Sequence, residues 1–392
     1  MRIAIFDHRV TPNSPVGSCH LHLVAGLCQE HEFVVFASEF ANPCPARIQY
    51  VPVKVPRRPL VLQYTCYHAA ASVAYQRYLR IAAQRPDIVQ VAEGNVIFGD
   101  IAYVHFCHSA YLRGWRRRSR PKGLRGLLRY LDHLLHACAE PHVFRRASQI
   151  VVPSLGLQKE IEALYPFVRG KIVVIPNPVA VDWFQRSESF YPNIFRAKHG
   201  IASEDMVLVF VALGHFELKG LEIVLKALHE LGDSRVKLWV VGGPRDLVRE
   251  WRQRAKQRCI ENRVQFWGFQ SDIRPFLWAA DAFILPSEYE TFSLASVEAA
   301  AAGLPLIVTP THVLKEFVRD GENGFLVERS VSSVAAAVRR LCLMDPASRQ
   351  RMGRAAQTAA RRYSPEYVLN MWRELYNQYS IQLRRGAAKW AE

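Results

Sequence analysis

The sequence predicts an α/β fold with two domains, each built on a parallel sheet that has helices on both faces. Short apolar runs typical of buried strands alternate with stretches typical of helices, and this alternation occurs twice along the chain. The two series meet at 176–178, where two prolines interrupt the pattern. A chain of 392 residues is also long enough for two domains of about 100 to 200 residues each.

The first series begins with the apolar run 3–6, which predicts a buried strand, and a helix is expected around 19–29. Further strands of this half are expected at 33–36, 87–92, 101–106, 150–153 and 172–176. In the second series, strands are expected to begin at Val207, Leu238, Val264, Ala282 and Leu306. Because strands alternate with helices, each series predicts one parallel sheet.

Composition limits the class of protein. Half of the residues are hydrophobic, which is enough for two cores. No run reaches the ~18 consecutive apolar residues expected of a membrane-spanning helix, and the first residues resemble a short strand rather than a signal peptide. The eight cysteines are scattered without a C-x-x-C motif, so we expect free thiols in a reducing cytosol. Walker A and G-x-G-x-x-G motifs are absent, which argues against P-loop and standard NAD chemistry.

The most informative segment is 286–309, PSEYETFSLASVEAAAAGLPLIVT. It places Glu290 and Glu298 between a strand and a helix expected at 293–302. Eight helical residues would cover roughly 12 Å, so the two carboxylates suit opposite ends of an elongated anionic ligand such as a nucleotide sugar. The exposed N-terminus of the helix would offer free N–H groups to a phosphate. The alternative is a capped surface helix with two solvated glutamates.

This segment resembles the E-x7-E signature of retaining glycosyltransferases with the GT-B fold, and of family 4 in particular. Other stretches match the same family in order and spacing. They are 154–184, 210–228, 237–243, 264–287 and 320–327. The resemblance spans nearly the whole chain, is strong in the C-terminal half and is weaker towards the N-terminus. Together these motifs indicate the superfamily but not the sugar that is transferred.

The resemblance implies the GT-B architecture, in which two Rossmann-like domains present their parallel sheets to a cleft. The first domain, 1–177, would bind the acceptor, and the second, 178–365, would bind the nucleotide sugar. The final stretch, 366–392, resembles the terminal helix of the family, which crosses back onto the N-terminal domain. The absence of any D-x-D motif argues against the metal-chelating glycosyltransferases of the other major fold.

Within the acidic segment, the resemblance assigns separate roles to five residues. Glu298 would accept hydrogen bonds from the ribose hydroxyls of the donor, and Glu290 would be catalytic and contact the transferred sugar. The backbone N–H groups of Phe292, Ser293 and Leu294 would bind the donor phosphate or sugar hydroxyls. The structural alternative for Glu298 is a first-turn glutamate stabilised by the helix dipole.

Lys219 is expected in the loop after the first strand of the second domain. By resemblance it would be catalytic, because a fixed cation there neutralises the diphosphate leaving group as the glycosidic bond breaks. Many relatives carry an arginine a few residues earlier, where this chain has His215 and Leu218, and we count His215 as donor-binding. The turn at Gly268 and Phe269 is expected to bind the base. Outside this context, a lone lysine on a loop is usually solvated.

Three residues of the N-terminal half are further candidates. Gly17 lies in a stretch that resembles the glycine loop of the family and would let the backbone approach the sugar phosphate; an ordinary turn is the alternative. Relatives carry one histidine near a strand end that hydrogen-bonds the donor sugar, and this chain offers His105 and His108. We choose His108 as catalytic and keep His105 in reserve as donor-binding. No third metal ligand is evident beside them, so no metal is expected.

The charge of the chain adds a candidate membrane contact. The formal net charge is +16, and the densest basic cluster, RGWRRRSRPKGLRGLLR, covers 113–129. It continues into leucines at helical spacing, so 113–136 would suit contact with an anionic membrane surface. A solvated basic helix packed on the N-terminal sheet is an equal alternative. Nucleic acid is not expected as a partner, because no aromatic RNA motif or known DNA-binding module accompanies the charge.

The sequence thus predicts a retaining glycosyltransferase (EC 2.4 class). It would move a sugar from a UDP- or GDP-sugar donor to a hydroxyl of a cell-envelope glycan or glycolipid, with no obligatory metal or other cofactor. We expect it in the cytoplasm, with peripheral contact at the inner face of the cell membrane. Two alternatives stay open: a nucleotide-sugar 2-epimerase-like enzyme, and a non-catalytic protein that binds nucleotide sugars or a membrane surface.

Overall fold

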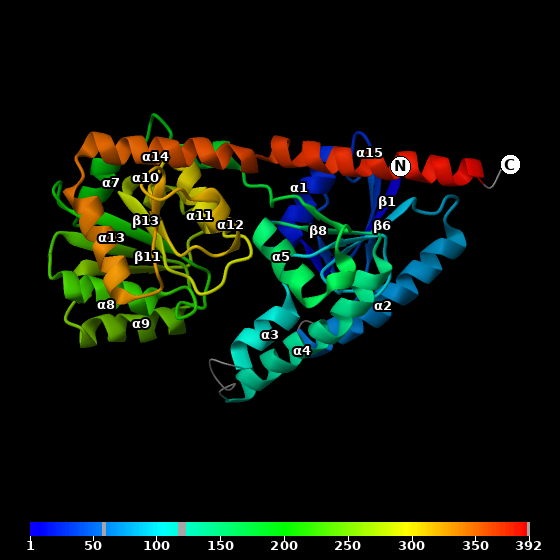
Figure 1. Ribbon diagram of the computed structural model, residues 1–392, viewed down its shortest axis with the longest axis horizontal. Coiled ribbons are helices and arrows are strands. Elements are labelled where there is room, and N and C mark those ends of the chain that lie inside the picture. The colour runs from blue at the N-terminus through cyan, green and yellow to red at the C-terminus, as the bar shows by residue number, and fades with distance from the viewer. Residues whose placement is uncertain (57–59, 117–122, 390–392) are drawn as a thin grey trace. The chain divides into compact units, whose positions relative to one another are not determined.

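The computed structural model describes residues 1–56, 60–116 and 123–389. The chain divides into two compact units, which are labelled by element in Figure 1. Unit 1 comprises Met1–Pro178 with Pro365–Glu392, and unit 2 comprises Val179–Ser364. Each unit is an α/β structure around one main parallel sheet, as the alternating sequence pattern predicts.

The sheet of unit 1 has seven parallel strands in the order β5-β3-β1-β6-β7-β8-β9. They are β1 (Arg2–Phe6), β3 (Glu32–Ala37), β5 (Ile48–Pro52), β6 (Ile88–Ala92), β7 (Ile101–Tyr103), β8 (Gln149–Val152) and β9 (Ile172–Val174). A separate short pair is formed by β2 (Arg9–Val10) and β4 (Glu39–Phe40). Strand β5 is not predicted from the sequence, because Ile48 is its one fully buried residue and no apolar run marks it.

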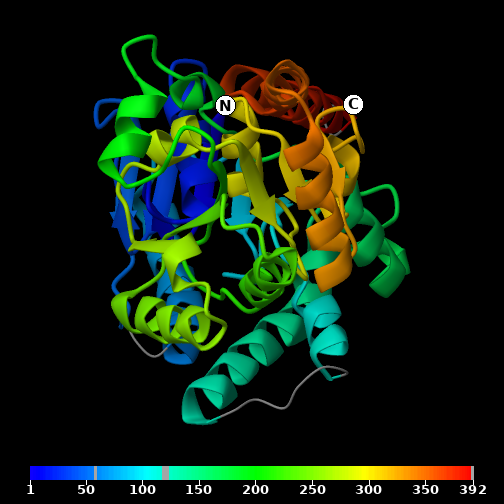
Figure 2. The same cartoon turned by 90° about the vertical axis from the view of Figure 1, so that its left-hand side faces the viewer.

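Helices cover this sheet on both faces and enclose two hydrophobic cores. They are α1 (Gly17–Leu27), α2 (Leu60–Ile81), α3 (His108–Arg116), α4 (Gly123–Arg146), α5 (Leu155–Leu164) and α15 (Pro365–Lys389). Trp372 and Tyr376 of α15 are buried in the core that includes α1. The last helix is therefore an integral part of unit 1. In Figures 1 and 2, α3 and α4 run beside each other, and the two helices are in direct contact.

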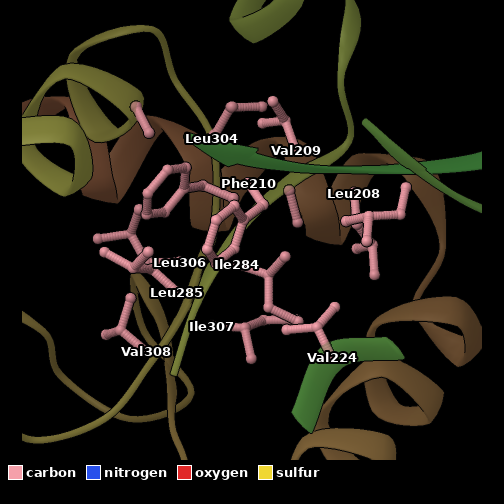
Figure 3. Close-up of a cluster of buried hydrophobic side chains, with 14 of the residues drawn as sticks. Leu208, Val209, Phe210, Val224, Ile284, Leu285, Leu304, Leu306, Ile307 and Val308 are labelled. Atoms are coloured by element: carbon pink, nitrogen blue, oxygen red, sulfur yellow. The ribbon is translucent and has the colours of Figure 1, made fainter. Parts of the chain in front are cut away.

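Unit 2 has six parallel strands in the order β12-β11-β10-β13-β14-β15. They are β10 (Met206–Val211), β11 (Val236–Val241), β12 (Val264–Gly268), β13 (Ala282–Leu285), β14 (Leu306–Val308) and β15 (Gly324–Leu326). The helices are α6 (Val181–Phe184), α7 (Pro192–Lys198), α8 (Leu221–Leu231), α9 (Arg245–Gln257), α10 (Arg274–Ala279), α11 (Leu294–Ala301), α12 (His312–Phe317), α13 (Val331–Leu343) and α14 (Pro346–Ala360). Apolar side chains of three central strands form the core shown in Figure 3. Burial on both faces explains why these strands are nearly continuous apolar runs.

In each sheet the strand that comes first in the chain lies in the interior, and the later strands continue the sheet on both sides of it. In unit 1, β1 lies between β3 and β6, and in unit 2, β10 lies between β11 and β13. At such a point the connections leave towards opposite sides, so a crevice opens beyond the carboxyl ends of the strands, where open α/β sheets bind their ligands. The loops after β1, β6, β10 and β13 are therefore the ones best placed to build a site.

Helices that could span a membrane are not found among the described residues.

Candidate functional site

The two predicted catalytic residues of unit 2 contact each other. Lys219 Nζ lies 2.5 Å from Glu290 Oε1. Lys219 follows β10 and Glu290 follows β13, and these strands are neighbours in the sheet. The side chain of Glu290 is only 7% exposed and that of Lys219 is 29% exposed. A buried carboxylate needs such a partner, because removing it from water alone is costly.

The loops that carry this ion pair are bonded to each other. The N–H of Glu288 donates to the carbonyl of Leu218 at 2.8 Å, and the Ser287 hydroxyl donates to the same carbonyl at 3.4 Å. Behind them, Thr309 Oγ1 donates to the carbonyl of Ser287 at 2.5 Å. Arg329 also donates to the carbonyl of Glu217 at 3.0 Å. These bonds hold the Lys219 loop against the Glu290 loop.

Gly220 lets the two loops approach closely. Its φ is +86°, and a Cβ at this position would lie 2.2 Å from the carbonyl oxygen of Pro286. No residue with a side chain fits there without movement of the backbone. The glycine after Lys219 is therefore required by the packing of the site.

Glu298 lies in the second turn of α11, which begins at Leu294. Burial raises the pKa of Glu298 to about 7. Only the last part of the interval between Glu290 and Glu298 is helical. The separation of roughly 12 Å predicted for these two residues assumed helix throughout, so it does not apply. The first-turn alternative for Glu298 is also wrong, because four helical residues precede it.

The start of α11 is more enclosed than the sequence predicts. Ser293 and Phe292 are buried, so the expected exposure of this helix end does not hold at these two residues, whereas Leu294 is half-buried. The Phe292 ring packs edge-on against Tyr363, with centroids 5.4 Å apart. Ser293 is at the N-cap position, but its hydroxyl bonds to the Ser296 hydroxyl at 2.8 Å instead of capping the first turn. Phe292 could thus serve a ligand only through its backbone.

The other predicted donor residues of unit 2 follow β10 and β12. His215 is exposed and has a φ of +53°, and its carbonyl accepts the N–H of Lys219 at 3.0 Å. Gly268 ends β12 with a φ of +65°, and its carbonyl accepts the N–H of Gly242 at 2.7 Å. Phe269 beside it is 66% exposed. All three lie at the edge of the sheet where the carboxyl ends of its strands meet, which also holds the ion pair; we call this the carboxyl edge.

Two glycines of this edge end the family-like stretch 237–243, but no role in the site was predicted for them from the sequence. Gly242 and Gly243 follow β11 with positive φ values. A Cβ on Gly242 would lie 2.1 Å from the Ala212 carbonyl, and one on Gly243 would lie 2.6 Å from the Phe216 ring. Consecutive glycines directly after an apolar strand are the sequence signal that could have identified them.

In unit 1, Gly17 is the first residue of α1. A Cβ at this position would lie only 1.7 Å from the carbonyl oxygen of Arg9. This close approach to the protein's own backbone explains the glycine without a ligand.

The structure separates the two candidate histidines. His108 begins α3, and its Nδ1 lies 2.9 Å from His133 Nδ1. Its ring stacks on that of His136, with centroids 4.4 Å apart. Burial, together with these two histidines, lowers the pKa of His108 well below its usual value. The side chain chosen from the sequence as catalytic therefore has a protein partner on one ring nitrogen.

His105 follows the end of β7, which stops three residues before the expected strand end. The residue is 6% exposed, and neither ring nitrogen makes a hydrogen bond with the described part of the chain. Burial lowers the pKa of His105 to about 3, so the ring is neutral at neutral pH. Its backbone N–H donates to Glu93 Oε1 at 3.0 Å. Glu93 was not predicted, because A-E-G-N after a strand resembles an ordinary turn.

A small cavity lies beside these residues, lined in part by Glu93, His108, His136 and Glu140. The cavity has room for roughly one water molecule. A sugar does not fit in it. Over the described ranges, no three His, Cys, Asp or Glu side chains are grouped so that they could hold a metal ion.

Two family models match the chain. The model described as "Glycosyltransferase Family 4" matches residues 16–183, and the one described as "Glycosyl transferases group 1" matches residues 205–343. Together they cover parts of both units.

Curated relatives agree with these matches. The D-inositol 3-phosphate glycosyltransferase of Streptomyces avermitilis is 30% identical over 230 residues, which are 55% of this chain and 49% of that protein. The lipopolysaccharide core biosynthesis glycosyltransferase LpsE of Rhizobium meliloti is 28% identical over 243 residues, or 61% and 62% of the two chains. The chain thus spans about half to three-fifths of the length of these relatives.

Solved structures share the whole architecture. WaaG, a glycosyltransferase involved in lipopolysaccharide biosynthesis, has a TM-score of 0.71 at 18% identity, covering 94% of this chain and 99% of that one. Anabaena Alr3699/HepE in complex with UDP and glucose has a TM-score of 0.72 at 18% identity, covering 96% and 100%. At these identities the likeness establishes the fold alone. From the two family models and this shared fold, we conclude that the chain belongs to the group 1 glycosyltransferases, family 4, and has their GT-B fold.

Proposed function

We propose that the chain is a retaining glycosyltransferase that uses a UDP- or GDP-sugar as donor and a hydroxyl of a cell-envelope glycan or glycolipid as acceptor. The observation that carries the proposal is the contact of Lys219 with Glu290 at the point where the sheet order of unit 2 reverses. It supplies a cation and a carboxylate at the edge where α/β sheets bind ligands. The UDP and glucose held by HepE support testing UDP-sugars first.

The chemistry needs few groups from the protein. The acceptor oxygen attacks the anomeric carbon on the face that the diphosphate leaves, and the bond from that carbon to the phosphate oxygen breaks. The departing phosphate oxygen takes the acceptor proton, so no metal step is required. The Lys219 ammonium neutralises the charge that develops on the diphosphate. Glu290 orients the sugar, and Glu298 accepts hydrogen bonds from the ribose hydroxyls.

The N-terminal ligand contact is reassigned in this proposal. The sequence favoured His108, but the ring nitrogens of His105, which make no hydrogen bond with the described chain, support His105 as the residue that binds a sugar hydroxyl. A neutral imidazole can donate and accept one hydrogen bond each, which suits a hydroxyl group.

A thermal-shift screen with UDP-, GDP- and ADP-sugars tests donor binding, because a ligand that binds only the folded state raises the Tm. Transfer is then measured with the donor that binds, using a lipid-linked glycan as acceptor. Glu290→Gln should lower kcat while the Tm shift from the donor persists, and the exposed Glu261→Gln of unit 2 serves as control. Donor turnover to a free epimer without acceptor would favour the 2-epimerase alternative, and binding without turnover would favour the non-catalytic one.

A face of α4 supports peripheral contact with an anionic membrane. Leu127, Leu131 and Leu134 are 47%, 38% and 39% exposed, and their spacing places them on one side of the helix. Arg129 and Arg113 are exposed in the same helical pair; residues 117–122 of the basic cluster lie outside the described part. An exposed row of leucines, on a helix pair that also carries exposed arginines, suits an interface with anionic lipid.

Vesicles rich in anionic lipid should retain the protein at low salt and release it at high salt. Leu131→Asn should weaken retention, while Leu155→Asn, at an exposed leucine of α5, should not. Equal retention of both variants would contradict membrane contact through α4.

A further inference from the structure

Glu93 is a carboxyl group of unit 1, with its side chain 15% exposed, that the proposed chemistry does not use. It follows β6, which lies beside β1, where the sheet order reverses. Its φ is +52°, a conformation that residues with a side chain adopt at a cost. Such residues persist only where the surrounding structure holds them, and they are common at functional sites.

Hydrogen bonds fix Glu93 against the end of β7. Its backbone N–H donates to the Tyr103 carbonyl at 2.9 Å. Its side-chain Oε1 accepts the backbone N–H of His105 at 3.0 Å. The same oxygen lies 3.7 Å from His105 Nδ1. The carboxyl group therefore joins the end of one strand to the stretch that carries the His105 ring.

The surroundings of His105 leave its ring nitrogens without a hydrogen-bond partner in the described chain. The ring packs on Tyr103, with centroids 4.1 Å apart. His20 faces it, but His20 Nδ1 is bonded to Asp7 at 2.7 Å. The Asn177 side chain interacts with the ring and favours its protonated form, while its side-chain oxygen accepts from Tyr103. A ring that is buried and unpartnered needs a ligand or water to satisfy it.

We propose that Glu93 is a positioning residue, whose carboxyl group fixes the backbone at His105 and so directs the His105 ring towards a hydroxyl group of the sugar ligand. The inference rests on the proposed function, because it takes His105 as a ligand contact. It adds Glu93 as a second residue, on which the orientation of the His105 ring towards the sugar depends.

The protonation states fit this role. Burial raises the pKa of Glu93 to about 8, and the nearby carboxyl groups of Glu140 and Asp7 act in the same direction. At neutral pH, Glu93 is thus a neutral carboxylic acid beside a neutral imidazole. Glutamine has nearly the same shape and is neutral at every pH, so Glu93→Gln should preserve the contact. Above pH 8, wild-type Glu93 ionises, whereas the glutamine does not.

Three variants test the proposal through activity. At pH 7, Glu93→Gln should keep kcat/KM within about threefold of wild type, whereas Glu93→Ala and Glu93→Gly should lower it by about 10- to 100-fold, as expected for a displaced ligand contact. Glycine accepts the left-handed backbone freely, so Glu93→Gly should stay folded with a Tm near that of wild type. The exposed Glu374→Ala of unit 1 should match wild type in both respects.

A second readout does not depend on activity. With isotope-labelled histidine, the His105 ring signal is identified by its loss in His105→Phe. In wild type and Glu93→Gln it should show one fixed tautomer at pH 7, and in Glu93→Gly it should change. Only the wild-type signal should shift as pH passes 8. If no sugar donor is turned over but these signals behave so, the proposed function fails and the positioning role stands. If Glu93→Gly leaves the signal and activity unchanged, or Glu93→Gln is as damaging as Glu93→Ala, the proposal is wrong.

Discussion

The carboxyl edges of the two sheets have the same design but carry different chemistry. In each unit the strand order reverses at the first strand, and a residue with a side chain adopts positive φ after a strand there, Glu93 in unit 1 and His215 in unit 2. The edge of unit 2 holds the Lys219–Glu290 ion pair, whereas the edge of unit 1 holds a neutral Glu93 and a neutral His105. The fold fixes where a site forms, and the loops decide what charge it carries.

Neighbouring groups explain the difference. In unit 2 a half-buried ammonium lies against a buried carboxylate, so each charge stabilises the other. In unit 1 the charged groups that act on Glu93 include the carboxyl groups of Glu140 and Asp7, which disfavour its ionisation. An edge with fixed charge suits a diphosphate, and a neutral edge suits hydroxyl groups.

The largest difference between the two edges is expected in kcat/KM, when one residue on each edge is replaced by a neutral residue of similar shape. Lys219→Met should lower kcat/KM by about 10²- to 10³-fold, the usual cost of removing one stabilising group from a transition state. Glu93→Gln should change it by less than about threefold. Steady-state kinetics at one temperature below both Tm values makes the comparison, with Lys226→Met, at an exposed lysine of α8, as control. Equal losses for the two edges would remove the distinction between them.

The close packing of the charged edge should appear in stability. Gly220→Ala places a Cβ against the Pro286 carbonyl and should lower the free energy of unfolding by more than about 2 kcal/mol. Gly232→Ala is the matched control, because Gly232 also has positive φ but open space around it. It should cost about 1 kcal/mol. Denaturant unfolding measures both, and similar costs would show that backbone conformation, rather than loop contact, determines the requirement for glycine.

The bond behind the ion pair should matter less than the glycine. Thr309→Val removes the donor to the Ser287 carbonyl and should cost about 1–3 kcal/mol by leaving a buried acceptor unpaired. Thr309→Ser should restore most of it, and Thr358→Val, at an exposed threonine of α14, should change little. If serine fails to restore stability, the methyl group rather than the hydroxyl of Thr309 is what unit 2 needs.

The charged edge was largely predictable from the sequence, and the neutral edge was not. The family motifs place Lys219 and Glu290 after separate strands, and parallel strands bring such loops to one edge. The family motif alone does not decide between His105 and His108, and the sequence also does not show that β7 ends at Tyr103, three residues before the expected end. Strand ends depend on pairing with β6 and β8, which local sequence does not reveal.

Long-range contacts account for the other missed residues. Glu93 is significant only because its side chain reaches the backbone of His105, twelve residues later in the chain. His133 and His136 lie in the stretch 113–136, for which the sequence left membrane contact and packing on the protein equally open, and they pack on His108 through the contact of α3 with α4. No spacing rule within one element predicts such contacts.

Two partly buried groups, His136 of unit 1 and Glu298 of unit 2, should change the stability of the protein in opposite directions as pH changes. Burial lowers the pKa of His136 to about 4 and raises that of Glu298 to about 7. The unfolded chain therefore binds the proton of His136 more readily, so this histidine costs stability as pH falls below about 6.5. For Glu298 the folded state holds the proton more tightly, so stability is lost as pH rises from about 4.5 through 7.

Replacing each group by a neutral one of similar size isolates these effects, which should be about 2 kcal/mol. Between pH 7 and pH 5, the stability of His136→Phe relative to wild type should increase, because the variant has no proton to exclude. Between pH 5 and pH 7, the stability of Glu298→Gln relative to wild type should increase, because it has no proton to lose. Denaturant unfolding at three pH values measures both, with the non-titrating, exposed Thr358→Val as the variant whose difference from wild type should not change. If lowering the pH changed the relative stability of both variants in the same direction, the two groups would not respond to pH with opposite sign.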